Sequence, residues 1–228
     1  MWPFELSGRE SPMHIAIGVY DEFTSLDAMG PYQVLQHVPG AEVVWCAAEA
    51  GIVRDDAGLL RMEVERTFDD VPRPDILVVP GGFITRKLAR ERHPIVDWIA
   101  GAHEHTTYTT SVCTGALLLG SAGILDGLEA TTHWAAYDDL ASYGAVPTEQ
   151  RVVEQGKIIT GAGVSAGIDM ALTLAGRLAG DEVAMAIQLA IEYDPHPPYD
   201  SGAPSKAPPA IYEMVAAIND ERAADASS

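Results

Sequence analysis

The chain has 228 residues, a mass of 24.3 kDa and a formal net charge of −19, from 14 Lys and Arg against 33 Asp and Glu. This acidic balance disfavours nucleic acid and anionic membranes as partners. The length and the hydrophobic fraction of 47% are those of a folded globular protein. We therefore expect one domain over residues 13–228, preceded by an N-terminal extension over residues 1–12 that is charged and lacks the apolar centre of a signal peptide.

Cysteine usage and hydropathy favour a cytoplasmic protein. The two cysteines, Cys46 and Cys113, are far apart, and no Cys-x-x-Cys pair is present. Such a chain has no disulfide framework of the secreted type, so a reducing cytoplasm is expected. The longest uncharged stretch, residues 106–125, contains several Ser, Thr and Gly, which is typical of buried core and not of a membrane span.

In the first half of the chain, buried strands alternate with helices. Residues 14–20 and 42–48 have the β-branched, nearly continuous apolar pattern of strands buried on both faces, and residues 26–37 between them have helical spacing. Residues 59–67 alternate like an exposed strand, and residues 75–79 form another buried strand that ends in Pro80-Gly81-Gly82. The pattern predicts a parallel sheet with any site at the carboxyl ends of its strands.

The second half continues this order. We expect a helix over 86–105, a strand over 108–112, a helix over 114–122, a hairpin over 152–160 and two further helices over 165–178 and 182–193. Six of the fifteen residues in 195–209 are proline, so this segment is extended. We expect it to pack on the domain or on a partner chain. A last helix covers residues 209–224.

Cys113 is the first candidate for chemistry. It lies where the strand Tyr-Thr-Thr-Ser-Val gives way to a helix of small residues. The unpaired N–H groups of a helix start lower the pKa of a thiol and favour the nucleophilic thiolate. A small buried hydrophobe is the alternative for Cys113, and it is the favoured interpretation of Cys46.

Two other side chains could act with such a thiol. Asp27 follows the first strand and so lies at the same end of the sheet as Gly82 and Cys113, where it could transfer a proton, although a helix N-cap is the commoner role of such a residue. His133 is a candidate base or a structural histidine. We expect no metal site, because no His and carboxylate cluster has ligand spacing. Residues 161–167 resemble a phosphate-binding loop only superficially, because they lack the lysine of a P-loop and the glycine spacing of a dinucleotide-binding motif.

Five motifs stand in order along residues 13–209. They are Leu26-Asp27-x-x-Gly30-Pro31, Val79-Pro80-Gly81-Gly82, Ser111-Val112-Cys113-Thr114-Gly115, Ala130-Thr131-Thr132-His133-Trp134 and Thr160-Gly161-x-Gly163-Val164-x-Ala166-Gly167-Ile168-Asp169. Together they resemble the ThiJ/PfpI superfamily and, within it, the isonitrile hydratases. The stretch Glu192-Tyr193-x-Pro195-x-Pro197-Pro198-Tyr199 resembles the hydratase tail.

The resemblance implies a flavodoxin-like three-layer α/β sandwich with a mostly parallel central sheet, which forms a homodimer and works without a metal or organic cofactor. Cys113 matches the family's nucleophile and Asp27 the acid beside it. The matched anion-holding N–H groups belong to Gly82 and Thr114.

The matched pocket residues are Val164 and Gly81. Ala162 departs from the family pattern, because the hydratases tend to carry a third glycine there. The implied reaction is the attack of the thiolate on the terminal carbon of an isonitrile, followed by hydrolysis of a covalent thioimidate to an N-substituted formamide. A buried carboxyl beside a thiolate has a raised pKa, which suits Asp27 as proton donor.

Three other branches of this superfamily offer alternatives. The protease-like branch has a histidine after the cysteine, where this chain has Thr114. The glyoxalase or deglycase branch typically has a glutamate at the position of Asp27, so small aldehydes remain a second substrate class. AraC-type regulators carry a similar ligand-sensing domain but continue into a basic DNA-binding region, whereas this sequence ends at Ser228 with an acidic tail.

Overall fold

The computed structural model describes residues 11–225. Most of the predicted N-terminal extension, residues 1–10, lies outside the described residues. The first strand begins at Met13, where the predicted domain begins.

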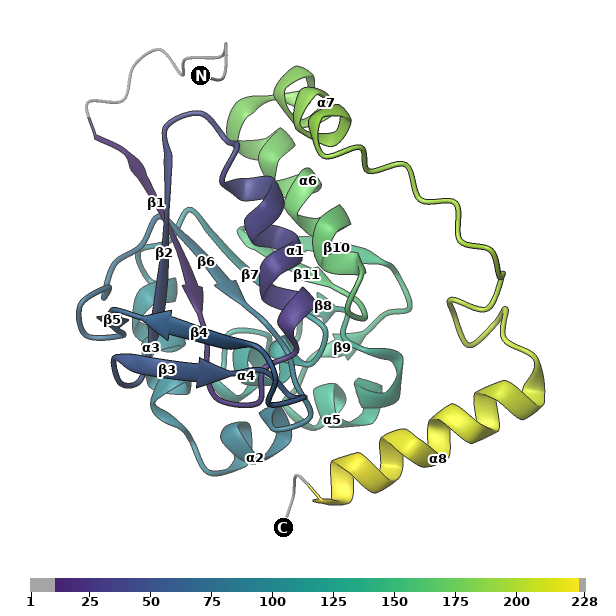
Figure 1. The fold of residues 1–228 in the computed structure, drawn as a ribbon. Helices are drawn as coiled ribbons and strands as arrows, with labels where there is room; N and C mark the ends of the chain where they lie inside the picture. The colour runs from purple at the N-terminus through teal and green to yellow at the C-terminus, as the bar shows by residue number, and fades with distance from the viewer. Residues whose placement is uncertain (1–10, 226–228) are drawn as a thin grey trace.

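A seven-stranded sheet forms the centre of the molecule (Figure 1). Its spatial order is β10-β11-β7-β6-β1-β2-β5, and all neighbouring strands are parallel except the antiparallel pair β10 and β11. The strands are β1 (Met13–Gly18), β2 (Ala41–Ala47), β5 (Arg66–Thr67), β6 (Ile76–Val79), β7 (Tyr108–Val112), β10 (Val152–Gln155) and β11 (Ile158–Gly161). The four strands predicted near residues 14, 42, 75 and 108 are confirmed as members of this sheet.

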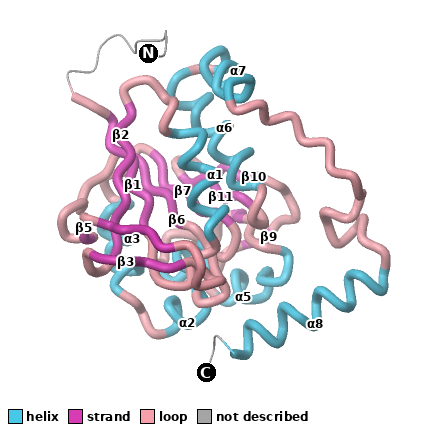
Figure 2. Tube along the Cα trace, in the orientation of Figure 1, coloured by secondary structure: helices cyan, strands magenta, loops and turns pink. Residues whose placement is uncertain are grey.

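Helices cover both faces of the sheet and complete a flavodoxin-like fold (Figure 2). On one face α1 packs against α6, which also packs against α7; on the other face α4 packs against α2 and α3. The helices are α1 (Ser25–Leu35), α2 (Thr85–Arg90), α3 (Pro94–His103), α4 (Gly115–Ser121), α5 (Tyr137–Ser142), α6 (Ala166–Ala179), α7 (Asp181–Ala190) and α8 (Pro209–Asp225), with the short 3-10 helix η1 (Trp134–Ala136) before α5.

The strands are buried because helices lie on both faces, which explains their continuous apolar sequences. All four residues of β6 and all four of β11 are buried. In the sheet order, β6 lies between β7 and β1, and the three strands run in the same direction. The loops that follow β1, β6 and β7 therefore meet at one edge of the sheet.

Two predicted elements are divided in the structure. The predicted helix over 86–105 consists of α2 and α3, because Arg92 has a φ of 52° and the residue before Pro94 is extended. The predicted strand over 59–67 consists of β4 (Arg61–Val64) and β5. β4 pairs with β3 (Gly51–Arg54) in a separate hairpin, whereas β5 pairs with β2.

The sequence did not reveal a further short parallel pair, β8 (Glu129–Ala130) with β9 (Val146–Pro147). Two residues per strand are too few to produce a recognisable alternation of apolar and polar side chains.

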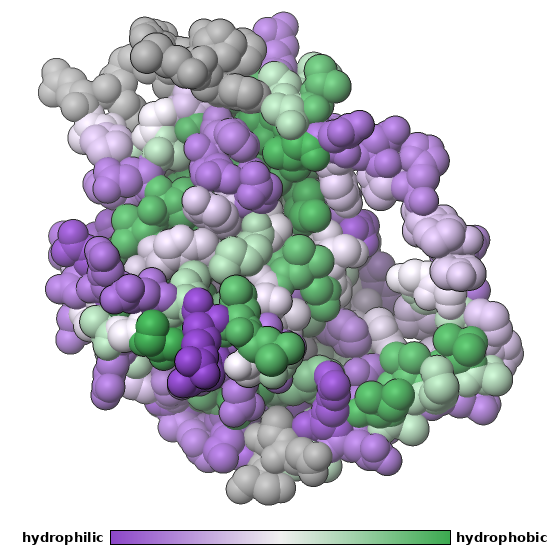
Figure 3. Space-filling view, in the orientation of Figure 1, coloured by the Kyte–Doolittle hydropathy of each residue, from purple (hydrophilic) through white to green (hydrophobic). Residues whose placement is uncertain are grey.

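The tail of the chain is a segment of residues 191–208 that leads from α7 to α8 (Figure 1). It contains no helix or strand, as its prolines predict. Most of its residues are exposed. It still contacts the body at two places: the Tyr193 hydroxyl donates a 2.9 Å hydrogen bond to Asp169 of α6, and residues 202–205 line a hollow together with residues of the body such as Arg151. Apolar surface is visible over α8 in Figure 3. Ile211 and Met214 of this helix are 44% and 53% exposed.

Candidate active site

Cys113 occupies a strained turn between β7 and α4. Its φ is 56°, a left-handed conformation that costs a non-glycine residue about 1–3 kcal/mol and is found most often at functional sites. Hydrogen bonds hold the backbone on both sides of the turn. The N–H of Cys113 donates to the carbonyls of Gly161 (3.1 Å) and Ala162 (2.7 Å), and its carbonyl accepts a 2.9 Å bond from the Thr132 hydroxyl.

The loop after β6 approaches this turn closely enough to require glycine. A Cβ atom at Gly81 would lie 2.6 Å from the backbone N of Thr114 and 2.8 Å from Oδ2 of Asp27. The N–H of Gly81 instead donates a 2.9 Å hydrogen bond to that Oδ2. Gly81, a predicted pocket residue, thus contacts the Asp27 carboxyl and is not in the pocket wall.

Asp27 lies in the first turn of α1 and is fully buried. The N-cap residue of this helix is Thr24, so the alternative role of Asp27 as the N-cap is wrong. Among residues 11–225, no hydrogen-bond partner is present for the second carboxyl oxygen, Oδ1. Burial raises the pKa of Asp27 to about 7, although the hydrogen bonds of the carboxyl with the Gly81 N–H and the Cys113 thiol act in the opposite direction.

The Cys113 thiol interacts with this carboxyl at the bottom of the site. Burial and then the charge of Asp27 raise the pKa of Cys113 well above its ordinary value, against the lowering effect of the Thr114 N–H and side chain. The sequence had indicated a pKa lowered by the helix start. That prediction is wrong, because Cys113 is only 6% exposed and removal from water outweighs the partial charge of the helix. At neutral pH the resting thiol keeps its proton.

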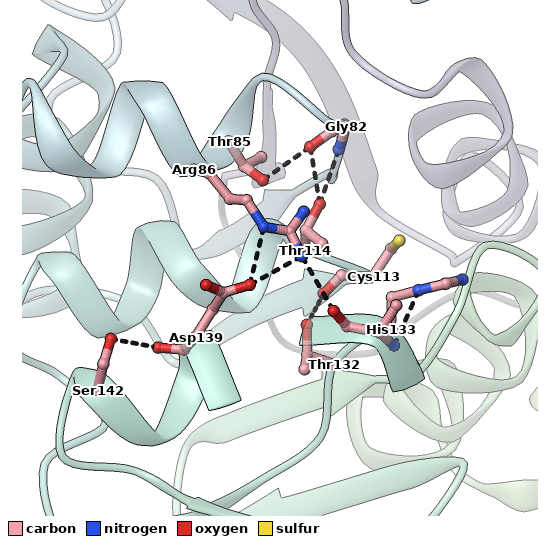
Figure 4. Close-up of polar contacts among 10 residues, drawn as sticks. Gly82, Thr85, Arg86, Cys113, Thr114, Thr132, His133, Asp139 and Ser142 are labelled. Carbon is pink, nitrogen blue, oxygen red and sulfur yellow. Dashed lines mark hydrogen bonds and ion pairs between the residues drawn. The ribbon is translucent and has the colours of Figure 1, made fainter. Parts of the chain in front are cut away.

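The two residues predicted to hold an anion through their N–H groups, Gly82 and Thr114, are hydrogen-bonded to each other (Figure 4). The Thr114 hydroxyl accepts a 3.0 Å bond from the Gly82 N–H and donates a 2.9 Å bond to the Gly82 carbonyl. The N–H of Thr114 is directed to the Cys113 sulfur. An anion at the sulfur thus meets the Thr114 N–H directly, and meets the Gly82 N–H only if the threonine hydroxyl gives up its bond.

A cavity of about 230 Å³ opens above the thiol. Cys113, Thr114, Gly82 and Val164 all line it, so four of the six predicted site residues share one space. The other lining residues are Thr24, Asp56, Phe83, Arg86, His133, Ala135, Asn219 and Arg222. A space of this size suits a small molecule.

Two cavity residues with ionisable side chains are held by their neighbours. Arg86 donates a 2.8 Å hydrogen bond from Nε to Asp139 and a 3.1 Å bond to the Ala135 carbonyl (Figure 4). Nδ1 of His133 accepts from the Ala135 N–H at 3.3 Å, and burial followed by the charge of Arg86 lowers its pKa, so the imidazole is neutral. His133 is therefore both a structural cap of η1 and a pocket residue.

The sequence analysis missed Tyr20, which lies just beyond β1 at the same sheet edge. Its buried hydroxyl donates a 2.6 Å bond to the Pro80 carbonyl. Burial raises its pKa, as do the charges of Asp27 and Cys113, so the ring lies near both. Its place at the end of a buried strand is the signal that could have identified it.

The described residues show neither a metal site nor a membrane span. No group of three or more His, Cys, Asp or Glu side chains in residues 11–225 is placed to hold a metal ion. Over the same residues, every helix is too short or too polar to cross a bilayer.

Comparisons with known proteins agree on the family. Residues 13–177 match the DJ-1/PfpI family. The chain is 41% identical over 201 residues to the isonitrile hydratase of Pseudomonas putida, which covers 88% of this chain and 87% of that protein. The crystal structure of a ThiJ/PfpI family protein from Pseudomonas syringae superimposes with a TM-score of 0.86 and 36% identity, over 96% of this chain and 92% of that one.

A more distant relative is the transcriptional regulator GbdR of Pseudomonas aeruginosa. It is 28% identical over 205 residues, which is 82% of this chain but only 52% of the regulator. The family match over residues 13–177 and the relationship to the P. putida protein both extend over most of the sequence. The chain therefore belongs to the DJ-1/PfpI family.

Proposed function

We propose that this protein hydrates isonitriles to N-substituted formamides, with Cys113 as nucleophile and Asp27 as proton carrier. The observation that carries the proposal is the buried contact between the Cys113 thiol and the Asp27 carboxyl beneath a small cavity. The 41% identity to an isonitrile hydratase over most of both chains supports this substrate class.

In the first half of the reaction, the thiol adds across the terminal carbon of R–N≡C. The sulfur attacks this carbon while Asp27 takes up the thiol proton, and the same proton then goes to the carbon, giving the thioimidate R–N=CH–S–Cys113. The raised pKa of the thiol suits this order, because the thiolate forms only when an electrophile is present to receive it. The Thr114 N–H can stabilise the negative sulfur.

In the second half, water adds to the carbon and a proton goes to the nitrogen. The adduct R–NH–CH(OH)–S–Cys113 then expels sulfur and loses the hydroxyl proton, which releases R–NH–CHO and restores the thiol. A carboxyl with a pKa of about 7 can give and accept protons in successive steps at neutral pH.

Apolar groups in the pocket wall suit a neutral substrate. Phe83, Ala135 and Val164 offer apolar surface to the R group. The Arg86 guanidinium already donates to Asp139 and to a backbone carbonyl, so it is not available as an open anion site.

The proposal includes a homodimer in the cytoplasm. Leu26, Met185 and Leu189 are apolar side chains of α1 and α7 that are 43% to 81% exposed, which supports burial against a second copy. Both thiols are free, and a reducing compartment would keep Cys113 active. Light scattering of the purified protein tests the dimer.

The test of function is turnover of a simple alkyl or aryl isonitrile, with methylglyoxal as a parallel substrate. We expect formamide from the isonitrile and, with a slow substrate, a mass increase of one whole isonitrile on the peptide that contains Cys113. Turnover of methylglyoxal alone would favour the aldehyde-directed branch. Reversible binding without turnover would favour a ligand-sensing role, and an adduct confined to Cys46 would contradict the mechanism.

A further inference from the structure

The C-terminal helix α8 reaches back to the pocket from outside the shared family domain. The family match ends at residue 177, whereas α8 begins at Pro209. Nevertheless Asn219 and Arg222 of α8 lie among the residues that line the Cys113 cavity. A segment added after the common fold thus forms part of the wall of the site.

Two ring contacts hold α8 against the body of the protein. Near its start, the Tyr212 ring lies 5.3 Å from the Trp134 ring, and near its end, the Arg222 guanidinium lies 5.2 Å from the centre of the Phe83 ring. The two contacts are ten positions apart along α8, which corresponds to about 15 Å of helix. Both contacts lie at the pocket: Phe83 and Arg222 line the cavity, and Trp134 directly follows the cavity residue His133.

One face of α8 is turned to the pocket. Tyr212, Asn219 and Arg222 are separated by seven and three residues, the spacing of a single helical face. Ile211, Met214 and Ile218 are on the adjoining side of the helix and are 44% to 53% exposed.

Asn219 carries a donor without a partner. Its Nδ2 atom is shielded from solvent, and no group among residues 11–225 accepts a hydrogen bond from it. Buried polar atoms in native proteins nearly always have a partner, so an unused donor in a cavity wall indicates a ligand that supplies the acceptor.

We propose that α8 is a specificity wall of the Cys113 pocket, which limits the size of the molecules that reach the thiol, and that Asn219 donates a hydrogen bond through Nδ2 to the bound ligand. The ligand class is a small neutral molecule with an apolar group and one acceptor. The identity of that acceptor rests on the proposed function: it is the oxygen of the product formamide and the nitrogen of the thioimidate that precedes it. Asn219 is thus a positioning residue.

The first test measures the Asn219 hydrogen bond without turnover. The rate at which iodoacetamide alkylates Cys113 is measured at increasing concentrations of an N-alkylformamide, which should bind in the pocket and slow the reaction. A Cys46→Ala background leaves Cys113 as the thiol that is followed. Asn219→Leu keeps the approximate size and Asn219→Asp keeps the shape, but neither can donate. We expect both substitutions to raise the formamide concentration needed for half-maximal protection by about 3- to 10-fold, which is the effect of losing one hydrogen bond. Asp220→Asn, an exposed neighbour outside the cavity, is the matched control and should behave like wild type.

The second test measures whether α8 limits the access of bulky reagents to Cys113. Tyr212→Ala removes one ring contact, so a bulky reagent such as N-phenylmaleimide should label Cys113 at least about 5-fold faster, while the rate with small iodoacetamide changes less than about 2-fold. The nitrogen of an alkyl isonitrile has no free lone pair, so the hydrogen bond forms only as the thioimidate forms. With this substrate, Asn219→Leu should lower kcat by about 3- to 10-fold and leave KM nearly unchanged.

The outcomes separate this proposal from the proposed function. If wild type does not hydrate isonitriles but the protection and labelling results hold, the function is wrong and the role of α8 stands. If protection is equal in all variants or absent in wild type, Asn219 does not donate a hydrogen bond to the ligand. If Tyr212→Ala leaves the labelling rates unchanged, α8 does not limit access to Cys113.

Discussion

The body of the molecule, residues 13–190, and the tail, residues 191–225, are built differently. Among the described residues, the buried apolar side chains all lie between Met13 and Ile187, around the central sheet. The tail has exposed apolar residues, such as Tyr199 at 79%, and contacts the body near the pocket through two rings. The comparison indicates that the body provides the stability and the reacting groups, whereas the tail serves the selection of ligands. The following predictions test this division.

The largest expected effect is loss of the nucleophile in the body. Cys113→Ala should abolish isonitrile hydration, and Cys113→Ser should be almost as inactive, because a serine hydroxyl is far harder to ionise than a thiol and a carboxylate whose pKa is about 7 is too weak a base to ionise it. Turnover and a circular dichroism spectrum are measured together, so that loss of folding is detected.

The matched control for this substitution is Cys46→Ala. Cys46 is a buried residue of β2 whose thiol pKa is raised by burial, and it lies outside the cavity. It should remain active. Full activity in Cys113→Ala would move the reaction to another part of the molecule.

The next effect concerns the proton carrier. Asp27→Asn keeps the size and the acceptor for the Gly81 N–H but has no transferable proton, so kcat/KM should fall by about 10² to 10⁴. Cys113 should still react with iodoacetamide, which shows that the site is intact. Near-normal turnover would reduce Asp27 to a structural residue.

The same variant tests the raised pKa through stability. Because the folded-state pKa of Asp27 is about 7, above its usual value of 3.8, wild type loses the contribution of the neutral carboxyl as the pH rises from about 4 to 7. The Asn side chain stays neutral. The difference in Tm, variant minus wild type, should therefore increase over this range. A constant difference would show that the pKa of Asp27 is not raised in the folded protein.

A pair of substitutions compares core packing in the two regions. Leu118 of α4 is fully buried, and Leu118→Ala should lower the free energy of unfolding by about 2–5 kcal/mol. This effect is measured by urea denaturation.

The smallest effect belongs to the tail. Ile218 of α8 is 45% exposed, and Ile218→Ala should change the free energy of unfolding by no more than about 0.5 kcal/mol in the same assay. A large loss of stability there would show that the tail shares the cooperative core, or that its apolar face is covered by a second copy.

The sequence alone determined the order and approximate bounds of the main elements. Short apolar segments bounded by turn residues, such as residues 75–79, favour strands buried on both faces. The prolines of 195–209 disfavour a helix, because each proline lacks a backbone N–H and fixes φ. The sequence also placed Asp27, Gly82 and Cys113 at one sheet edge, since parallel strands end together.

Only the tertiary structure decided how these groups behave. The pKa of Cys113 is raised and not lowered, because removal from water and the charge of Asp27 depend on residues distant in sequence. The Gly82 N–H is occupied by the Thr114 hydroxyl, and Asn219 and Arg222 reach a pocket whose other residues, from Thr24 to Val164, belong to the body of the chain. Burial, hydrogen-bond partners and pocket walls are set by non-local packing, which a periodic pattern in one segment cannot report.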